Sequence, residues 1–203
     1  MHALSSLLTA TRARHSHVCP RQVLGVRMAL AGAAALDLEI PRRDKSLVVI
    51  AETDGCFTDG LEVAAGVSVG RRTLCVEDYG KVAATFVDVD TGDAIRIAPR
   101  PDVRSRALEY APGEKRHYAA QLAGYQVMPE EELFFITPVI LTPGIEEIVS
   151  RAGVRTSCAA CGEEIINERE ILMGGVAYCR SCMGQTYYQI AVHAMPVFAT
   201  IEL

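Results

Sequence analysis

The sequence predicts an α+β fold: a core domain with a mostly antiparallel sheet and flanking helices, followed by a small C-terminal treble-clef zinc finger. Two observations lead to this prediction. Strand candidates within the first 150 residues lie next to one another, and two of them are joined by a hairpin signal, instead of alternating regularly with helices. Four of the seven cysteines gather after residue 157 in two Cys-x-x-Cys pairs. A polar, glycine-containing segment precedes them, so we place the domains at residues 1–152 and 153–203.

The helices are predicted from apolar periodicity and capping residues. Residues 5–14 read as a short helix capped by Ser5 or Ser6. Pro20 opens a longer helix over residues 21–38, whose many small side chains would allow another helix to approach closely. Three further helices are expected at residues 59–65, 101–110 and 114–124.

The strands are predicted from β-branched and apolar runs bounded by turn residues. The turn at residues 90–93 joins two of them into a hairpin. The five expected strands lie at residues 46–51, 73–76, 83–89, 94–98 and 132–141. A further short hairpin is expected between the two Cys-x-x-Cys pairs, at residues 170–178.

Charge and apolar runs exclude some classes of protein. The net charge of −5 argues against a nucleic-acid partner. The longest apolar run, Val23–Leu36, is interrupted by Arg27 and is too short to cross a membrane. The N-terminal residues lack the features of a signal peptide, so we expect a cytoplasmic protein with reduced cysteines. Residues 1–43 carry six Arg against Asp37 and Glu39; this is either a solvated helix face or a site for an anionic ligand.

The four C-terminal cysteines have the spacing of a metal site. Cys158-x-x-Cys161 and Cys179-x-x-Cys182 are separated by seventeen residues. Two such turns can complete a tetrahedral Zn²⁺ site with four thiolates, which leaves no open position and is therefore structural. A helix predicted at residues 183–194 would give the treble-clef arrangement. The alternatives are a thiol–disulfide pair or cysteines that are buried by coincidence.

A second group of ligand-type residues precedes the long N-terminal helix. His15, His17 and Cys19 alternate along the chain, so in extended backbone they share one face. Cys56 lies at the turn between a predicted strand and a helix. One His and two Cys are the ligand count of an open, catalytic-type zinc site. Alternatively, the histidines are surface residues and both cysteines are small buried apolar groups, as we expect for Cys75.

Several different short motifs follow one another along the chain. They are His15-Ser-His17-Val-Cys19-Pro20, Leu24–Ala29, Asp54-Gly55-Cys56, Asp78–Lys81 and Ala84–Phe86. In these motifs the sequence resembles the FmdE/FwdE family of formylmethanofuran dehydrogenase proteins. The Cys-x-x-Cys-Gly-Glu segment at residues 158–163 is similar to the TraR/DksA-type zinc finger that many members carry. The resemblance implies an α+β core with a treble-clef finger, frequent dimers and a His/Cys metal site in the core.

Carried over by position, that metal site falls on His17, Cys19 and Cys56, with His15 next to it. The sequence departs from the family pattern at one position. Many members have a Cys after the glycine that corresponds to Gly66, and this chain has Val67 there. A site that needed this thiolate would have one ligand fewer here.

The resemblance leads to the function hypothesis of a cytoplasmic, zinc-binding accessory protein linked to molybdenum/tungsten or one-carbon redox metabolism. It would form a homodimer, with components of molybdenum or tungsten enzymes as further partners. Its cofactors would be a structural Zn²⁺ in the finger and a second Zn²⁺ or other transition metal in the core.

Two other functions stay open from the sequence. One is a zinc-dependent enzyme that uses His17, Cys19 and Cys56, with Asp54, Tyr79 and Lys81 as candidates for proton transfer or electrostatic stabilisation. The other is a regulator that docks on RNA polymerase or nucleic acid through its finger. The net charge of −1 over residues 151–203 argues against phosphate binding by the finger but not against docking on a protein.

Overall fold

The computed structural model describes residues 4–14, 17–149 and 151–190. The chain divides into two compact units, Met1–Val149 and Ser150–Leu203, which we call the core unit and the C-terminal unit. Each unit is considered by itself. Among the described residues, no helix has the length and apolar character needed to cross a membrane.

The core unit is built on one five-stranded sheet with the strand order β2-β1-β3-β4-β5. β1 and β2 are parallel, whereas the other three neighbouring pairs are antiparallel. The sheet confirms the predicted α+β class and the hairpin between β3 and β4. Its strands are β1 (Leu47–Ala51), β2 (Leu74–Val76), β3 (Ala84–Asp88), β4 (Ala94–Pro99) and β5 (Phe134–Val139).

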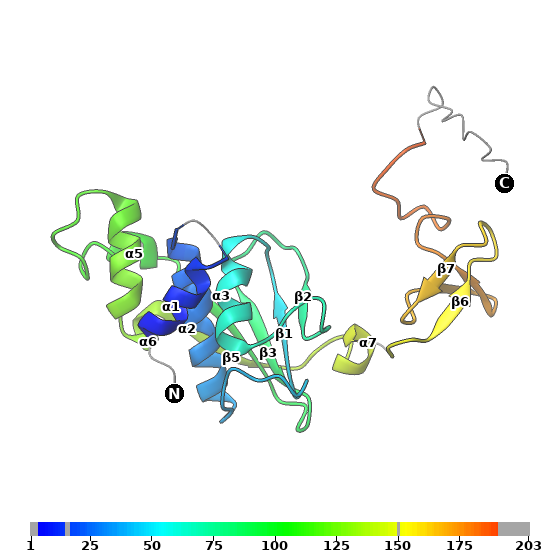
Figure 1. The fold of residues 1–203 in the computed structure, drawn as a ribbon, viewed down its shortest axis with the longest axis horizontal. Coiled ribbons are helices and arrows are strands. Elements are labelled where there is room, and N and C mark those ends of the chain that lie inside the picture. The colour runs from blue at the N-terminus through cyan, green and yellow to red at the C-terminus, as the bar shows by residue number, and fades with distance from the viewer. Residues whose placement is uncertain (1–3, 15–16, 150, 191–203) are drawn as a thin grey trace, which may run out of the picture. The chain divides into compact units, whose positions relative to one another are not determined.

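A layer of three helices covers one face of this sheet (Figure 1). It consists of α1 (Leu4–Arg12), α2 (Pro20–Ala35) and α3 (Cys56–Ala65). Alternate residues of β1 pack under this layer, namely Leu47, Val49 and Ala51. The opposite residues, Val48 and Ile50, pack with α7 (Ile145–Val149) on the other face. Because β1 is covered on both sides, all five of its residues are buried.

The remaining helices are shorter than the sequence suggested or are shifted along the chain. The helix expected at 101–110 is reduced to α4 (Val103–Arg106), and the one expected at 114–124 is α5 (His117–Val127), which packs on α2. The start of the last predicted strand forms α6 (Glu130–Leu133) instead. α3 begins at Cys56, three residues earlier than predicted, because Gly55 adopts a φ of 77° and lets the chain turn sharply into the helix.

The C-terminal unit contains two small hairpins. β6 (Arg155–Ser157) pairs with β7 (Glu164–Ile166), and β8 (Ile171–Met173) pairs with β9 (Val176–Tyr178). The predicted helix at 183–194 is wrong over residues 183–190, which form turns and irregular backbone. Gly184 has a φ of 79°, a left-handed conformation that ends a helix directly after the second Cys-x-x-Cys pair. The last four residues of that prediction lie outside the described residues.

The contact between α2 and α3 is the closest in the helix layer, because both helices carry a glycine where they meet. A methyl group placed on Gly25 would overlap the carbonyl oxygen of Phe57, and one placed on Gly60 would meet the carbonyl oxygen of Gln22. Both clashes are with backbone, which cannot rotate away as a side chain does. The first turns of α2 and α3 are therefore held against each other.

We expect Gly25→Ala to lower the free energy of unfolding by roughly 1–3 kcal/mol, because the added methyl group must push α2 and α3 apart. Urea unfolding followed by circular dichroism measures this change. Gly113→Ala is the matched control, since no atom lies within 4 Å of the methyl group it adds. Equal stability of the two variants would contradict the close helix contact.

Candidate functional site

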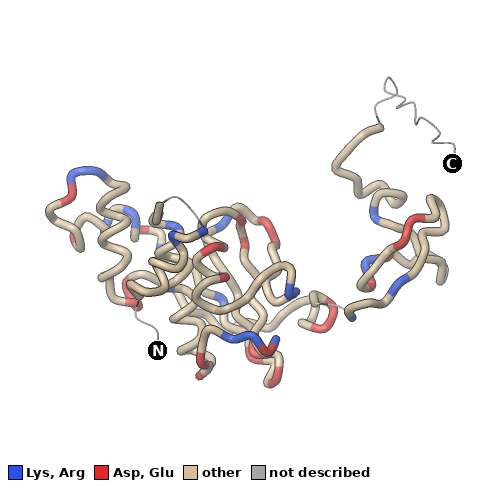
Figure 2. Tube along the Cα trace, viewed as in Figure 1, with Lys and Arg blue, Asp and Glu red and all other residues tan. Residues whose placement is uncertain are grey.

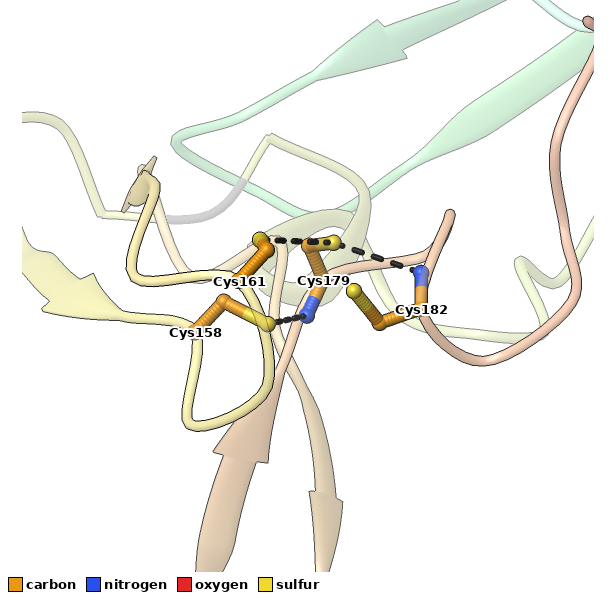
Figure 3. Close-up of side chains that lie close together, drawn as sticks. All are labelled: Cys158, Cys161, Cys179 and Cys182. Carbon is orange, nitrogen blue, oxygen red and sulfur yellow. Dashed lines mark hydrogen bonds between the residues drawn. The ribbon is translucent and has the colours of Figure 1, made fainter. Parts of the chain in front are cut away.

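The structure brings the four C-terminal cysteines together (Figure 3). The sulfur atoms of Cys158, Cys161, Cys179 and Cys182, the four-cysteine cluster, all lie within 4.8 Å of one another. Cys158 follows β6 and Cys179 follows β9, so each hairpin delivers one Cys-x-x-Cys turn to the cluster. The Sγ atoms of Cys161 and Cys179 are 3.9 Å apart. Zn–S bonds of about 2.3 Å in a tetrahedron place sulfur atoms about 3.8 Å apart, so the spacing fits a metal ion.

Backbone N–H groups point at the sulfur atoms of this cluster. The backbone nitrogen of Cys179 donates to Cys158 Sγ over 3.3 Å, and that of Cys182 donates to Cys179 Sγ over 3.4 Å. Hydrogen bonds from the backbone of Cys179 and Cys161 lower the pKa of Cys158 to about 6. Contacts with the other three thiols raise the pKa of Cys182 to about 12. The metal-free cluster thus accommodates one thiolate easily and further ones with difficulty, and a divalent cation would remove that conflict.

A second pair of thiols lies in the core unit, at the starts of α2 and α3. Cys19 is the N-cap residue of α2 and is 8% exposed, and Cys56 is the first residue of α3. Burial raises the pKa of Cys56, and a side-chain hydrogen bond with Cys19 and the charges of Cys19 and Asp59 raise it further. These effects outweigh the helix N-terminus, which favours a thiolate. We call Cys19 and Cys56 the core thiol pair.

Two further side chains, which the sequence motifs do not include, belong to the surroundings of the core thiol pair. Gln22 accepts a hydrogen bond of 2.9 Å from the backbone nitrogen of Cys19, while its own Nε2 is buried with no hydrogen-bond partner in the described part of the chain. Tyr118 comes from α5, and burial together with the charges of Cys19 and Cys56 raises its pKa. The capping position of Gln22 was recognisable in the sequence, but no local spacing could indicate Tyr118.

The structure assembles the predicted core metal site only in part. His15 lies outside the described residues, and His17 is exposed. Among the described residues, the four-cysteine cluster is the one group of three or more His, Cys, Asp or Glu whose ligand atoms all lie within 4.8 Å. His17 does not complete such a group with the core thiol pair. A metal site at these four residues therefore stays a prediction.

The proposed catalytic candidates lie on loops near the end of β1. Asp54, Tyr79 and Lys81 are all exposed. The backbone nitrogens of Tyr79 and Lys81 donate to the carbonyl oxygen of Glu52, at 3.0 and 3.1 Å, which holds their loop beside the end of β1. Val67, where many family members have a cysteine, is 3% exposed and packs in the hydrophobic core.

We expect the iodoacetamide reaction of Cys56 in the metal-free chain to have its pH midpoint above the ordinary thiol value, because burial and Cys19 disfavour the thiolate. Cys19→Ala should shift that midpoint to lower pH, since it removes a hydrogen bond and a charge that raise the pKa. Mass spectrometry of the labelled peptides gives the rate at each pH. The control is Cys75→Ala, and a Cys19→Ala profile equal to the control would show that the two thiols do not interact.

Known proteins to which this chain is similar include one from Archaeoglobus fulgidus and one from Syntrophus aciditrophicus. Over 97 residues, or 46% of this chain, it is 33% identical to a "Probable S-adenosyl-L-methionine-binding protein" of Archaeoglobus fulgidus. The match spans only about a quarter of that protein, 26% of its length. The crystal structure of a tungsten formylmethanofuran dehydrogenase FmdE-like protein from Syntrophus aciditrophicus has the same fold, with a TM-score of 0.58 and 18% identity over 93% of this chain and 96% of that one.

A family model described as FmdE, molybdenum formylmethanofuran dehydrogenase operon, matches residues 14–135. The match includes the core thiol pair and all of the sheet except most of β5, and it ends before the four-cysteine cluster. This is the family to which the motifs of the sequence pointed. The chain belongs to the FmdE family.

Proposed function

We propose that this protein is a cytoplasmic, metal-binding accessory protein that serves molybdenum- or tungsten-dependent one-carbon redox enzymes and acts as a homodimer. In this proposal the four-cysteine cluster holds a structural Zn²⁺, and the core thiol pair binds a second transition metal together with His17, with His15 next to the site. The observation that carries the proposal is the convergence of four sulfur atoms within 4.8 Å. Membership of the FmdE family supports the link to these enzymes.

The composition of the C-terminal unit supports a structural role for its metal. Of the described residues in this unit, only Cys158 and Ile165 are buried. So little buried surface cannot offset the conformational entropy lost on folding, and a metal ion would supply the missing free energy. Four thiolate ligands favour Zn²⁺ among the common divalent ions and leave no position open for a substrate.

The core thiol pair would suit a metal that is exchanged. At neutral pH the raised pKa of Cys56 keeps this thiol protonated, so that metal binding must displace a proton. Val67 supplies no sulfur, so the protein would provide few ligands and leave a coordination position open. A site of this kind loses its metal more easily than the closed cluster, which is the property that a carrier or an accessory protein needs.

We expect the purified chain to contain two metal ions and the Cys19→Ser/Cys56→Ser variant to contain one, because the variant loses only the core site. Elemental analysis by inductively coupled plasma mass spectrometry counts the ions per chain. Cys75→Ser, a cysteine that belongs to neither group, should keep both. An unchanged count in the double variant would remove the core site and leave the cluster alone.

We also expect a strong chelator to unfold the C-terminal unit while the core unit stays folded, since only the C-terminal unit lacks a buried apolar core. Hydrogen–deuterium exchange with mass spectrometry would then show protection lost at β6 to β9 and kept at β1 to β5. Added Zn²⁺ should restore the protection. Persistent protection of β6 to β9 without metal would argue against a structural zinc.

A further inference from the structure

A cavity of about 380 Å³ lies in the core unit beside the first turns of α2. Its wall comes from α2, from the segment between β2 and β3, from the segment that leads from β4 into α4, and from α5. This volume falls within the range of sites that bind small molecules. The lining side chains that matter here are Arg21, Leu24, Arg100, Arg104, Gln121 and Tyr125.

Three of these side chains are arginines, and their charges are poorly compensated. Arg21 and Arg104 are exposed and make no ion pair within the described residues. Arg100 donates through Nε to the carbonyl oxygen of Glu131 over 2.7 Å, and its guanidinium carbon lies 4.3 Å from the ring centre of Phe135. In the described part of the chain it too makes no ion pair with a carboxylate. Along the core unit, basic and acidic residues are otherwise interspersed (Figure 2).

The carboxylate of Glu132, on which the charge of Arg100 acts, is already engaged. Glu132, whose pKa is lowered mainly by hydrogen bonds from Tyr110 and Arg106 and slightly by the charge of Arg100, accepts a hydrogen bond of 2.5 Å from the Tyr110 hydroxyl. It is bonded to Arg106 rather than to the three arginines of the cavity. Positive charges that converge on one cavity without carboxylates attract an anion, and guanidinium groups bind phosphate and carboxylate oxygens in pairs of hydrogen bonds.

The rest of the cavity wall is apolar, which restricts the kind of anion further. Leu24, Val82, Val103 and the ring of Tyr125 line it, and Gln121 adds an amide that can donate or accept a hydrogen bond. An inorganic ion would leave this apolar surface in contact with water. We propose that the cavity binds a small organic molecule whose phosphate or carboxylate group contacts Arg21, Arg100 and Arg104 and whose apolar part lies against Leu24 and Tyr125.

The cavity adjoins the core thiol pair. Pro20 lines the cavity and directly follows Cys19 in the chain. Gln121 lines the cavity, and Tyr118, one helical turn earlier on α5, is close enough to Cys19 and Cys56 to feel their charge. A ligand in the cavity would therefore lie at the end of α2 that Cys19 caps. The inference goes beyond the proposed function and does not require a metal at the core thiol pair.

Isothermal titration calorimetry of the full chain tests the ligand class with three probes: phenyl phosphate, benzoate and the neutral benzyl alcohol. We expect at least one anion to bind ten times or more tightly than benzyl alcohol, and the tighter anion identifies the preferred group. If neither anion binds more tightly than the alcohol, the proposal is wrong.

Substitutions then locate the binding site. Arg21→Gln and Arg104→Gln should each raise the Kd for the preferred anion about tenfold, because each removes one charge-assisted hydrogen bond to the anion. Arg12→Gln, which removes the same charge from an exposed position at the end of α1, should leave the Kd within twofold. If all three substitutions raise the Kd equally, the effect comes from the net charge of the protein, and the proposed binding site is wrong.

Chemical modification of the unmutated chain gives an independent readout that does not depend on how the variants fold. Phenylglyoxal reacts with accessible guanidinium groups, and peptide mass spectrometry reports each arginine separately. The preferred anion should slow the modification of Arg21 and Arg104 and leave Arg12 unaffected. Modification of Arg21 and Arg104 at the same rate with and without the anion would contradict the proposal.

Discussion

The core unit depends on the close contact between α2 and α3. Gly25 and Gly60 remove the side chains that would separate the two helices, so backbone packs on backbone at their first turns. α3 leads from β1 to the parallel strand β2, and α2 packs on β3 and β4, so the same contact ties the helix layer to the sheet. The core thiol pair is a product of this arrangement, because Cys19 and Cys56 occupy the starts of the two helices.

The two units are stabilised by different chemistry. The core unit has a continuous set of buried apolar side chains between its helices and its sheet. The described part of the C-terminal unit has almost none, and its four sulfur atoms occupy the place where a core would be. Loss of a methyl group should thus matter most in the core unit, whereas loss of one sulfur should matter most in the C-terminal unit.

The sequence predicted features whose physical cause is local. All five strands of the sheet and the β3–β4 hairpin follow from short apolar runs and turn residues. The four-cysteine cluster follows from a spacing that places two Cys-x-x-Cys turns on one centre. The helix predicted at residues 183–194 was wrong over residues 183–190, because its periodicity gave no weight to Gly184, which takes a left-handed conformation. The early start of α3 was missed for the related reason that Gly55 permits a sharp turn.

Features that join distant segments could not be predicted. The charges of the core thiol pair act on Tyr118, which lies on a helix about 60 residues further along the chain than Cys56, and nothing in the neighbouring sequence of Tyr118 indicates this. The arginines of the cavity come from two separate segments, α2 and the segment that leads from β4 into α4, and only Arg21 belonged to the basic stretch that the sequence singled out. Such convergence is set by how α5 and the β4–α4 segment pack on α2, which is a property of the assembled fold.

The raised pKa of Cys56 has a consequence for the chain before it acquires any metal. Peroxides and disulfides attack the thiolate form of cysteine and react slowly with the protonated form. Burial and the neighbouring Cys19 keep Cys56 protonated at neutral pH, so the newly made chain resists oxidation at the position where two thiols stand next to each other. The environment that makes metal binding depend on proton release thereby preserves the sulfur atom of Cys56 in the reduced state that binding requires.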